Sequence, residues 1–462
     1  MSTHASAIPA AKLRSMMRGE VIVPGDPTYD DARKVWNGDI DRRPALIARC
    51  ASVDDVRAAL AFGLAQGLRI VVKSGGHSLP GHCIADGALM IDLRPMNKVE
   101  VDVANRRATV QGGAIWSEVD APTQAAGLGV TGGHVSHTGV AGLTLGGGIG
   151  HLMRKHGLVV DNLESAEIVT ADGRVLRASA TENEDLFWAI RGGGGNFGIA
   201  TEFVIKLVPV GPIVLGGLAF WAPDKGPVLL QRYREFCKTC PDELTTILVH
   251  LYAPPFEFVP KAVQMTPGYA LIAVGTDIPL AEQALKELRG FGPPLFDIIG
   301  PMPYLAVQGM LDPAQPPGTK TYAKSHYLPA LTDQAMAAFH AGAMAMPAGP
   351  SAAFLLQMGG AVARVSEDAT AFGGRNAAFQ TLFLGVWEDD AGRPVSMKWV
   401  RDLWDSLVPS ARGAYVNLAD DLDEAALKVT YGEAKFTRLQ KLKAKYDQGN
   451  VFNLNQNIRP QA

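Results

Sequence analysis

The chain has 462 residues, of which 47% are apolar, and it contains 50 glycines. This length and composition allow a large buried core divided over two or three domains. The formal net charge is -3, and acidic and basic residues are interspersed. The charge pattern therefore contains no basic stripe for nucleic acid and no polybasic segment for a membrane surface, so we expect a small-molecule ligand.

Neither a targeting segment nor a disulfide framework is evident. The amino-terminal MSTHASAIPAAKLRSMMRG lacks an apolar stretch of signal-peptide length, and no later stretch stays apolar for the ~18 residues of a transmembrane helix, so we expect a cytoplasmic protein. Of the four cysteines only Cys237 and Cys240 lie close together in sequence. Because no second pair exists, a structural role at the end of a helix is favoured over the alternative, half of a zinc site.

Strands and helices alternate in the first two hundred residues. Ser52 and Asp55 resemble a capping box before a helix that Gly67 ends, and RIVVK follows as a buried strand. Further strands are expected in ALMIDL, KVEVDV and RATVQ, before a helix through WSEVDAPTQAAG. Asp172 and Gly173 predict a hairpin turn, TENEDLFWAI a capped helix, and IATEFVIKLVPV a strand that ends this region near residue 210.

A second region extends from there to about residue 410. Proline is more frequent in it, and strands such as YALIAVGT and TLFLGVW alternate with helices such as LAEQALKELRGF. The tail that follows contains a basic amphipathic helix, whose lysines are expected to form a solvated face. These patterns predict two domains and a C-terminal segment.

Glycine clusters occur in three stretches, SGGHS at 74–78, TGVAGLTLGGGIG at 138–150 and RGGGGNFG at 191–198. Glycine lets the main chain approach a ligand closely, so backbone N–H groups can face phosphate oxygens. The last stretch satisfies GxGxxG, but a helix precedes it and a strand follows, which is the reverse of a dinucleotide-binding turn. The clusters therefore indicate an anionic cofactor held by loops outside a Rossmann fold.

These stretches resemble the berberine-bridge-enzyme-like branch of the vanillyl-alcohol oxidase and p-cresol methylhydroxylase (PCMH) flavoproteins. The matching elements are VKSGGHSLPGH, DGALMIDLRPMNKVEVD, TGVAGLTLGGGIGHLMRKHGL, DNLESAEIVTADG, RGGGGNFGIATEF and YDQGNVFNLNQNI, in the order of the family and over nearly the whole chain. The resemblance implies an α+β, two-domain PCMH-type fold. In it, residues 1–207 form the FAD-binding domain, 208–410 an antiparallel-sheet substrate domain, and 411–462 a segment that returns to the FAD domain.

FAD is the cofactor that the resemblance implies. His77 of the GGH motif would be bonded covalently to the 8α carbon of the isoalloxazine, whereas the residues alone also allow a histidine that caps the turn. Gly198 and Ile199 would lie near the adenine. The other residues expected to bind FAD are Lys73, Ser74, Gly75, Gly76, Ser78, His82, Gly133, Thr138, Gly139, Gly142, Leu143, Gly146, Gly147, Gly148, His151, Asn417, Asn455 and Asn457.

A single covalent link is expected. Many members of the branch attach the flavin a second time through a cysteine, and Val135 of VSHTGV stands in that position here. Cys83 is near in sequence but does not align with the second attachment point. His134 and His137 have HxxH spacing, yet a glycine-rich loop does not place both rings on one helical face, so no metal site is expected.

Three residues are candidates for the chemistry beside the flavin. A flavin accepts a hydride while a protein base removes a proton from the substrate. By resemblance, Tyr431 of VTYGEAKFTRL is the candidate base, although Lys435 departs from the more usual YGxNYxRL of the family. Tyr415 matches a Y-x-N strand of the family. Gln357 lies in a strand from which it could face the substrate, and packing is the alternative role for each residue.

We therefore expect an FAD-dependent oxidase that takes a hydride from a small alcohol, sugar, phenol or amine and passes electrons to O₂, giving H₂O₂. By resemblance, Thr138 lies near the reactive edge of the flavin, where a small side chain leaves room for oxygen. The alternatives are a dehydrogenase with another acceptor and a flavin-binding protein without turnover. A separate substrate region of about 200 residues argues against the last. The sequence leaves the substrate and the oligomeric state open.

Overall fold

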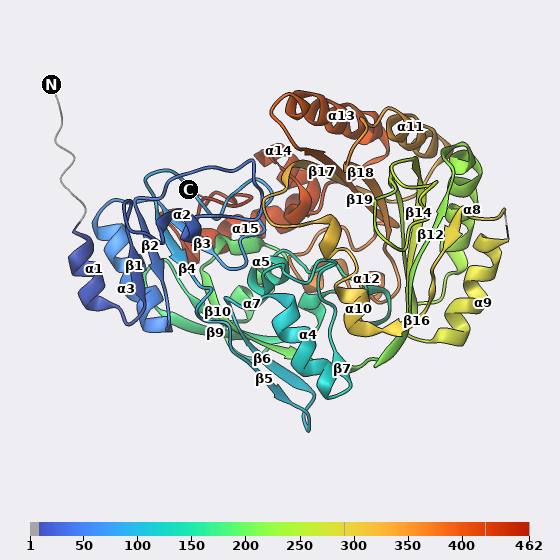
Figure 1. Cartoon of the computed structure of the whole chain (residues 1–462). Coiled ribbons are helices and arrows are strands. Elements are labelled where there is room, and N and C mark those ends of the chain that lie inside the picture. Colours follow the sequence, from blue (N-terminus) through green and yellow to red (C-terminus); the bar gives the residue numbers. More distant parts are fainter. Residues whose placement is uncertain (1–8, 291, 421, 462) are drawn as a thin grey trace.

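The computed structural model describes residues 9–290, 292–420 and 422–461. The chain has a two-domain α+β fold, in which a four-stranded sheet, a five-stranded sheet and a two-stranded sheet lie with their helices beside one large antiparallel sheet (Figure 1). Residues 1–8 of the amino-terminal segment discussed above lie outside the described residues. Among the helices of the described residues, none combines the length and apolarity needed to cross a bilayer.

The first sheet has the strand order β1-β2-β4-β3, and only its β1–β2 pair is antiparallel. The side chain of Ser52 caps helix α3, as expected, by accepting from the N–H of Asp55. The Asp55 carboxylate instead accepts from the N–H groups of Arg18, Gly19 and Ala51, so only half of a capping box forms. The elements are α1 Ala10–Met16, β1 Glu20–Ile22, α2 Tyr29–Ala32, β2 Leu46–Arg49, α3 Val53–Ala65, β3 Ile70–Lys73 and β4 Leu89–Asp92.

The second sheet is antiparallel throughout, with the order β5-β6-β10-β8-β9. The predicted hairpin joins β8 and β9, and Gly173 has the positive φ of 79° that its turn requires. Helix α7 forms where predicted, but Asn183 before it provides no side-chain cap. The elements are β5 Val99–Asp102, β6 Arg107–Gln111, α4 Trp116–Ala125, β7 Leu128–Gly129, α5 Val140–Leu145, α6 Met153–His156, η1 Val159–Asp161, β8 Leu163–Val169, β9 Val175–Ser179, α7 Glu184–Ile190, η2 Gly194–Asn196, β10 Ile199–Lys206 and β11 Val208–Pro209.

The large sheet has the order β15-β12-β14-β13-β18-β19-β17, with β16 also paired to β12. Helices α8, α9, α11 and α13 cover its outer face with a shared apolar core (Figure 1). The other face looks toward the first two sheets. The elements are β12 Ile213–Trp221, η3 Pro223–Lys225, α8 Gly226–Thr239, β13 Leu244–Tyr252, β14 Pro267–Gly275, α9 Ile278–Arg289, β15 Phe296–Asp297, β16 Gly300–Pro303, α10 Tyr304–Gln308, η4 Asp312–Ala314, β17 Lys320–Leu328, α11 Asp333–Met344, β18 Ala352–Gln357, α12 Ala361–Arg364, η5 Glu367–Ala369, β19 Phe379–Trp387 and α13 Gly392–Leu407.

The C-terminal segment returns to the first half of the chain through η6 Val408–Ser410, η7 Val416–Leu418, α14 Glu424–Tyr431 and α15 Glu433–Tyr446 (Figure 1). Leu439 and Leu442 of α15 belong to the same core as Trp188 of α7. The expectation that the lysines of this helix form a solvated face is wrong for two of them, Lys435 and Lys443, which are 5% and 0% exposed.

The physical reason is that each buried ammonium is paired with a carboxylate and donates to at least one backbone carbonyl. Lys443 donates to the Asp447 carboxylate at 2.6 Å and to the carbonyls of Asn196 and Phe452 at 2.8 and 2.9 Å. Burial of a charge is tolerated when it is paired and hydrogen-bonded in this way. The lysine thereby fixes the end of the chain to the loop that follows α7.

Candidate active site

A cavity of about 1250 Å³ lies between the glycine-rich loops of the first half and the inner face of the large sheet. Ligand pockets usually enclose about 300–1,000 Å³. The cavity is therefore large enough for two ligands, such as a cofactor and a substrate. We call the side formed by the loops at 74–83, 133–149 and 193–200 the floor.

Glycines in the floor serve two purposes. A Cβ on Gly75 would lie 2.4 Å from the backbone nitrogen of Gly139, so these two glycines let their loops touch. A Cβ on Gly142 or Gly195 would meet nothing within 4 Å, because both positions face open space. The second pair leaves bare backbone toward the cavity, which is what a closely bound cofactor requires.

Buried polar atoms of the floor also fit a polar cofactor. Among the described residues, Nε2 of His134 and Oδ1 of Asn455 have no hydrogen-bond partner although both residues line the cavity. Buried polar groups in proteins are nearly always paired, so such atoms indicate a bound ligand or water. The polar edges of FAD can supply the missing partners.

Most of the residues predicted to bind FAD come together at this cavity. Those that line it are Ser74, Gly75, Gly76, His77, Ser78, His82, Gly133, Thr138, Gly139, Gly142, Leu143, Gly198, Ile199, Asn417 and Asn455.

Six others lie behind the cavity wall: Lys73, Gly146, Gly147, Gly148, His151 and Asn457. Gly146, Gly147 and Gly148 are glycines because of protein contacts, since a Cβ would lie 2.1 to 2.4 Å from Asn417, Phe372 and Val159 respectively. The Lys73 ammonium donates to the carbonyl of Ala32 at 2.8 Å. His151 packs edge-on against His134. These residues shape the floor from beneath.

His77 is held rigidly at the cavity. Its ring stacks on Trp36 with centroids 4.9 Å apart, and its Nε2 lies 2.6 Å from Nδ1 of His137. Burial, with a smaller contribution from His137, lowers the pKa of His77 to about 3, so the imidazole is neutral at physiological pH. The hydrogen bond at Nε2 and the stacking on Trp36 fix the orientation of this neutral imidazole.

The two histidines of the HxxH pattern point to different partners. His137 faces His77, whereas His134 packs against His151 with ring centroids 4.6 Å apart. Burial lowers the pKa of His134 to about 4. The two rings of the HxxH pattern therefore contact different histidines, His137 contacting His77 and His134 contacting His151.

Tyr415 has its hydroxyl oxygen surrounded by N–H donors. Gly148 N–H and Asn417 Nδ2 donate to it at 3.0 Å, and Ile149 N–H at 3.4 Å. Asn417 Nδ2 also donates to the carbonyl of Leu143 at 3.1 Å, which fixes the orientation of the amide. Burial raises the pKa of Tyr415, whereas the three donors lower it. Burial outweighs the donors, so the pKa stays raised, but donors aimed at one oxygen favour its negatively charged form, which makes Tyr415 a candidate base.

Tyr431 is placed differently. It lines the cavity near Gly193, but its hydroxyl donates to the carbonyl of Gly192 at 3.1 Å and burial raises its pKa. A hydroxyl that donates to a carbonyl is held in its protonated form. The geometry therefore favours Tyr415 over Tyr431 as the base.

The expectation that Gln357 could face the substrate is wrong. Alternation along β18 directs Ala352, Phe354 and Leu356 to the cavity. Gln357 falls on the opposite face, where its Oε1 accepts from Thr246 at 2.6 Å under helix α8. The position in the strand, which the sequence does not reveal, decides this.

The large sheet closes the cavity with a surface that we call the roof. Tyr252, Trp387 and Lys320 line the cavity at the ends of β13, β19 and β17. The members that come from the interiors of β12, β13, β14, β18 and β19 are all aliphatic residues or phenylalanine. They are Leu218, Ile247, Val249, Leu251, Ala270, Ile272, Ala352, Phe354, Leu356, Leu382, Leu384 and Val386.

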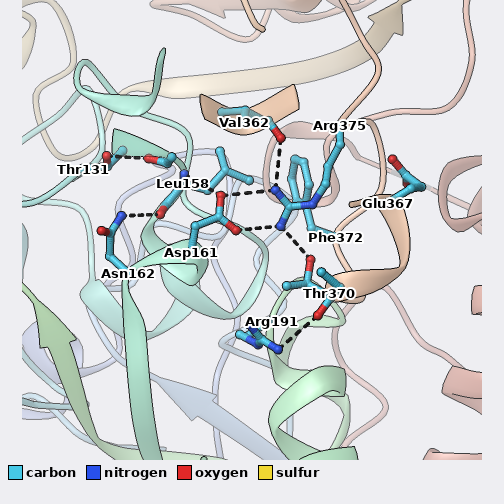
Figure 2. Close-up of polar contacts among 12 residues, drawn as sticks. Thr131, Leu158, Asp161, Asn162, Arg191, Val362, Glu367, Thr370, Phe372 and Arg375 are labelled. Atoms are coloured by element: carbon cyan, nitrogen blue, oxygen red, sulfur yellow. Dashed lines mark hydrogen bonds and ion pairs between the residues drawn. The ribbon is translucent and has the colours of Figure 1, made fainter. Parts of the chain in front are cut away.

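A buried ion pair between Asp161 and Arg375 joins the two halves of the molecule (Figure 2). Arg375, which is fully buried, binds the Asp161 carboxylate in a bidentate manner at 2.7 and 3.2 Å and donates to Thr370 at 2.8 Å. It thereby fixes the loop that carries Phe372, whose ring packs edge-on against Tyr415. The pair positions the back wall of the site.

Two functional residues of the site were not singled out for their role by the sequence. Trp36 belongs to no recognisable motif, and only the fold brings it to His77. The HxxH spacing of His137 points only to a metal ligand. Its place directly before Thr138, an expected FAD-binding residue, is the signal that could have assigned it to the same site. Contacts between side chains so far apart in sequence are set by the packing of separate loops.

Comparison with known proteins agrees with this geometry. The chain matches the FAD binding domain family over residues 44–179 and the berberine and berberine like family over residues 414–459. It is 32% identical over 451 residues to an FAD-linked oxidoreductase of Dictyostelium discoideum, covering 96% of this chain and 95% of that protein.

Solved structures give the same result. That of 6-hydroxy-D-nicotine oxidase from Arthrobacter nicotinovorans superimposes with a TM-score of 0.88 at 27% identity, over 96% of this chain and 98% of that one. A chitooligosaccharide oxidase follows with a TM-score of 0.85 at 26% identity, over 97% and 100% of the two chains. The cofactor is FAD, and the chain belongs to the berberine-bridge-enzyme-like family of FAD-linked oxidoreductases.

Proposed function

We propose that this protein is an FAD-dependent oxidase that dehydrogenates a small molecule and passes the electrons to O₂, giving H₂O₂. The observation that carries the proposal is the Tyr415 hydroxyl, which three N–H donors surround at the edge of a cavity with a cofactor-shaped floor. Residues 1–207 and 411–462 bind the cofactor, and 208–410 supply the substrate side. A cytoplasmic location stays a prediction from the sequence.

Each side of the site has a separate task. Bound FAD supplies the acceptor for the hydride. Tyr415, as the tyrosinate that its three N–H donors favour, accepts the proton from the substrate hydroxyl or amine at its phenolic oxygen, and Asn417 holds that oxygen in place. Thr138 leaves space for O₂ at the floor.

We further propose one covalent bond to the flavin, formed by His77. Nε2 is hydrogen-bonded to His137, so the bond forms at Nδ1. Joining a ring nitrogen to a methyl carbon of the flavin releases two protons and two electrons, which O₂ accepts as H₂O₂. Val135 has no nucleophile, and burial raises the pKa of Cys83, which keeps that thiol protonated.

Acid precipitation followed by mass analysis of tryptic peptides tests the covalent bond. The pellet should stay yellow, with one FAD on the peptide that contains His77, and His77→Ala should release the colour to the supernatant. A flavin mass on a Cys83 peptide contradicts the assignment.

The acceptor is tested separately. Anaerobically photoreduced enzyme is mixed with O₂ in a stopped-flow instrument, and rapid return of the oxidised flavin spectrum with equimolar H₂O₂ is expected. Slow reoxidation by O₂ together with fast reoxidation by a quinone would establish the dehydrogenase alternative. Absence of flavin bleaching by any substrate would favour a binding protein.

A further inference from the structure

We infer that the substrate is a largely apolar molecule with a single oxidisable hydroxyl or amine, and not a carbohydrate. This inference rests on the proposed function and names the substrate class of the same site. It is carried by the roof, in which the interiors of five strands direct aliphatic and phenylalanine side chains toward the floor, with Tyr252 and Trp387 lining the cavity at strand ends.

The roof lacks polar groups because of how the sheet distributes them. On the outer face, Thr246 donates to Gln357 at 2.6 Å, away from the cavity. On the inner face, Gln380 donates to Ser325 at 2.8 Å, and both side chains are fully buried beside the C-terminal segment. These polar side chains therefore lie outside the cavity lining.

Loops around the roof continue the same surface. The cavity is also lined by four loop residues, Phe256, Phe258, Met310 and Leu311, and by Met302 of β16. Polar side chains that line the cavity from the large sheet lie at the ends of strands. Tyr252 is the last residue of β13, and Lys320 is the first residue of β17. The wall that would contact the body of a substrate is therefore apolar.

A carbohydrate fits this wall poorly. Each sugar hydroxyl that loses water against an aliphatic side chain needs a new hydrogen-bond partner, and an unpaired buried hydroxyl lowers affinity. Apolar carbon surface gains affinity in the same place. On the opposite wall, Tyr415 lines the cavity and can meet the single oxidisable hydroxyl or amine of such a substrate.

Similarity of fold does not decide between these classes. Structures of a nicotine-type oxidase and of a chitooligosaccharide oxidase superimpose on this chain about equally well, with TM-scores of 0.88 and 0.85. The fold alone therefore does not name the substrate, and its class is inferred from the residues of this site.

Binding to the oxidised holoenzyme tests the inference. Cinnamyl alcohol and N-methylbenzylamine are the apolar probes, and chitobiose and xylobiose are the saccharides. Each is titrated under anaerobic conditions, with the change in flavin absorbance and calorimetry as readouts. The apolar probes should bind at least about tenfold more tightly, which corresponds to the loss of one well-made polar contact for the sugar. Equal or tighter binding of the saccharides, or no binding of either apolar probe, overturns the inference.

A matched pair of variants localises the effect to the roof. Val249→Thr exchanges a cavity-lining methyl group for a hydroxyl of similar size and should weaken binding of cinnamyl alcohol about fivefold. Val274→Thr makes the same change at a buried valine that packs with Val214 and Tyr304, and it should leave binding unchanged. Equal effects of the two variants would contradict the role of the roof, and flavin content checks that both proteins fold.

The outcome is distinguishable from failure of the proposed function. FAD retention and the reaction of photoreduced enzyme with O₂ need no substrate, so they test the oxidase assignment alone. An enzyme that retains FAD, reacts rapidly with O₂ and prefers xylobiose would keep the proposed function and refute the apolar substrate.

Discussion

The phenolic oxygen of Tyr415 is the single atom on which the proposed chemistry depends most. Its three N–H donors come from two backbone positions after α5 and from one side chain, Asn417. Gly146 has to be glycine for this arrangement, because a Cβ there would lie 2.1 Å from Oδ1 of Asn417. Glycine at position 146 is therefore required for Asn417 to reach the Tyr415 hydroxyl.

Tyr415→Phe should slow flavin reduction by roughly a hundred- to ten-thousand-fold, the contribution of a positioned base, with little change in substrate Kd. Rapid-mixing measurement of flavin bleaching separates the two quantities. Tyr431→Phe is the control, because its hydroxyl donates to a backbone carbonyl and should not affect the proton transfer. A slow Tyr431→Phe enzyme beside a normal Tyr415→Phe enzyme would reverse the assignment.

His137 should assist attachment of the flavin to His77. Bond formation at Nδ1 of His77 makes the ring cationic unless Nε2 loses its proton, and Nδ1 of His137 lies 2.6 Å away to accept it. His137→Phe keeps a ring but removes this acceptor, so covalent incorporation of FAD into apoprotein should be roughly a hundredfold slower. Acid-stable flavin is measured against time, and His340→Phe on α11, which does not line the cavity, should incorporate FAD at the normal rate.

At the scale of elements, the six-residue helix α5 presents its glycine side to the cavity. Gly142 lies within the helix, lines the cavity and has no protein atom within 4 Å of an added Cβ. A glycine inside a helix costs about 0.5–1 kcal/mol relative to alanine, so its retention here indicates a ligand that needs the space.

Gly142→Ala should therefore stabilise the apoprotein by about 0.5–1 kcal/mol and weaken FAD binding. Denaturant unfolding of apoprotein and flavin content after purification measure the two effects. Gly300→Ala, at another position with open space around an added Cβ, should leave flavin content unchanged. Full FAD retention by Gly142→Ala would show that this face of α5 does not contact the cofactor.

At the scale of the whole molecule, the two halves meet at buried polar contacts. The Asp161–Arg375 pair is one. Another lies between α4 and α10, where Gln308 donates to the buried carboxyl of Asp120 at 3.2 Å. Burial, with Asp312 nearby, raises the pKa of Asp120 to about 7, although Gln308 lowers it. This carboxyl is protonated in the folded protein at pH values where it ionises in the unfolded chain.

A raised folded pKa makes stability depend on pH. The contribution of Asp120 is fully present below its ordinary pKa near 4 and is lost as pH rises to about 7. Asp120→Asn has no carboxyl to ionise, so its free energy of unfolding should not fall in this pH range. The difference in free energy of unfolding between the variant and the wild type should therefore grow from pH 4 to pH 7 by at most about 4 kcal/mol. Denaturant unfolding at pH 5 and pH 8 measures it. Asp224→Asn, at an exposed site, should keep the pH dependence of the wild type.

The glycine clusters and most strands and helices could be recognised from the amino-acid sequence alone. The family, the α+β fold and FAD followed from the resemblance that these motifs carry. Glycine patterns and strand periodicity are local, so they can be recognised without knowing what lies beside them. His77 and most of the floor were predictable for the same reason.

Only the tertiary structure decided which side chains meet. Gln357 turned to the helix face because of its place in the alternation of β18, and Lys443 is buried because Asn196 and Phe452 supply carbonyls from elsewhere in the chain. The three donors on Tyr415 converge from segments more than two hundred residues apart in sequence. Such contacts depend on the packing of distant segments, and no local pattern of residues encodes that packing.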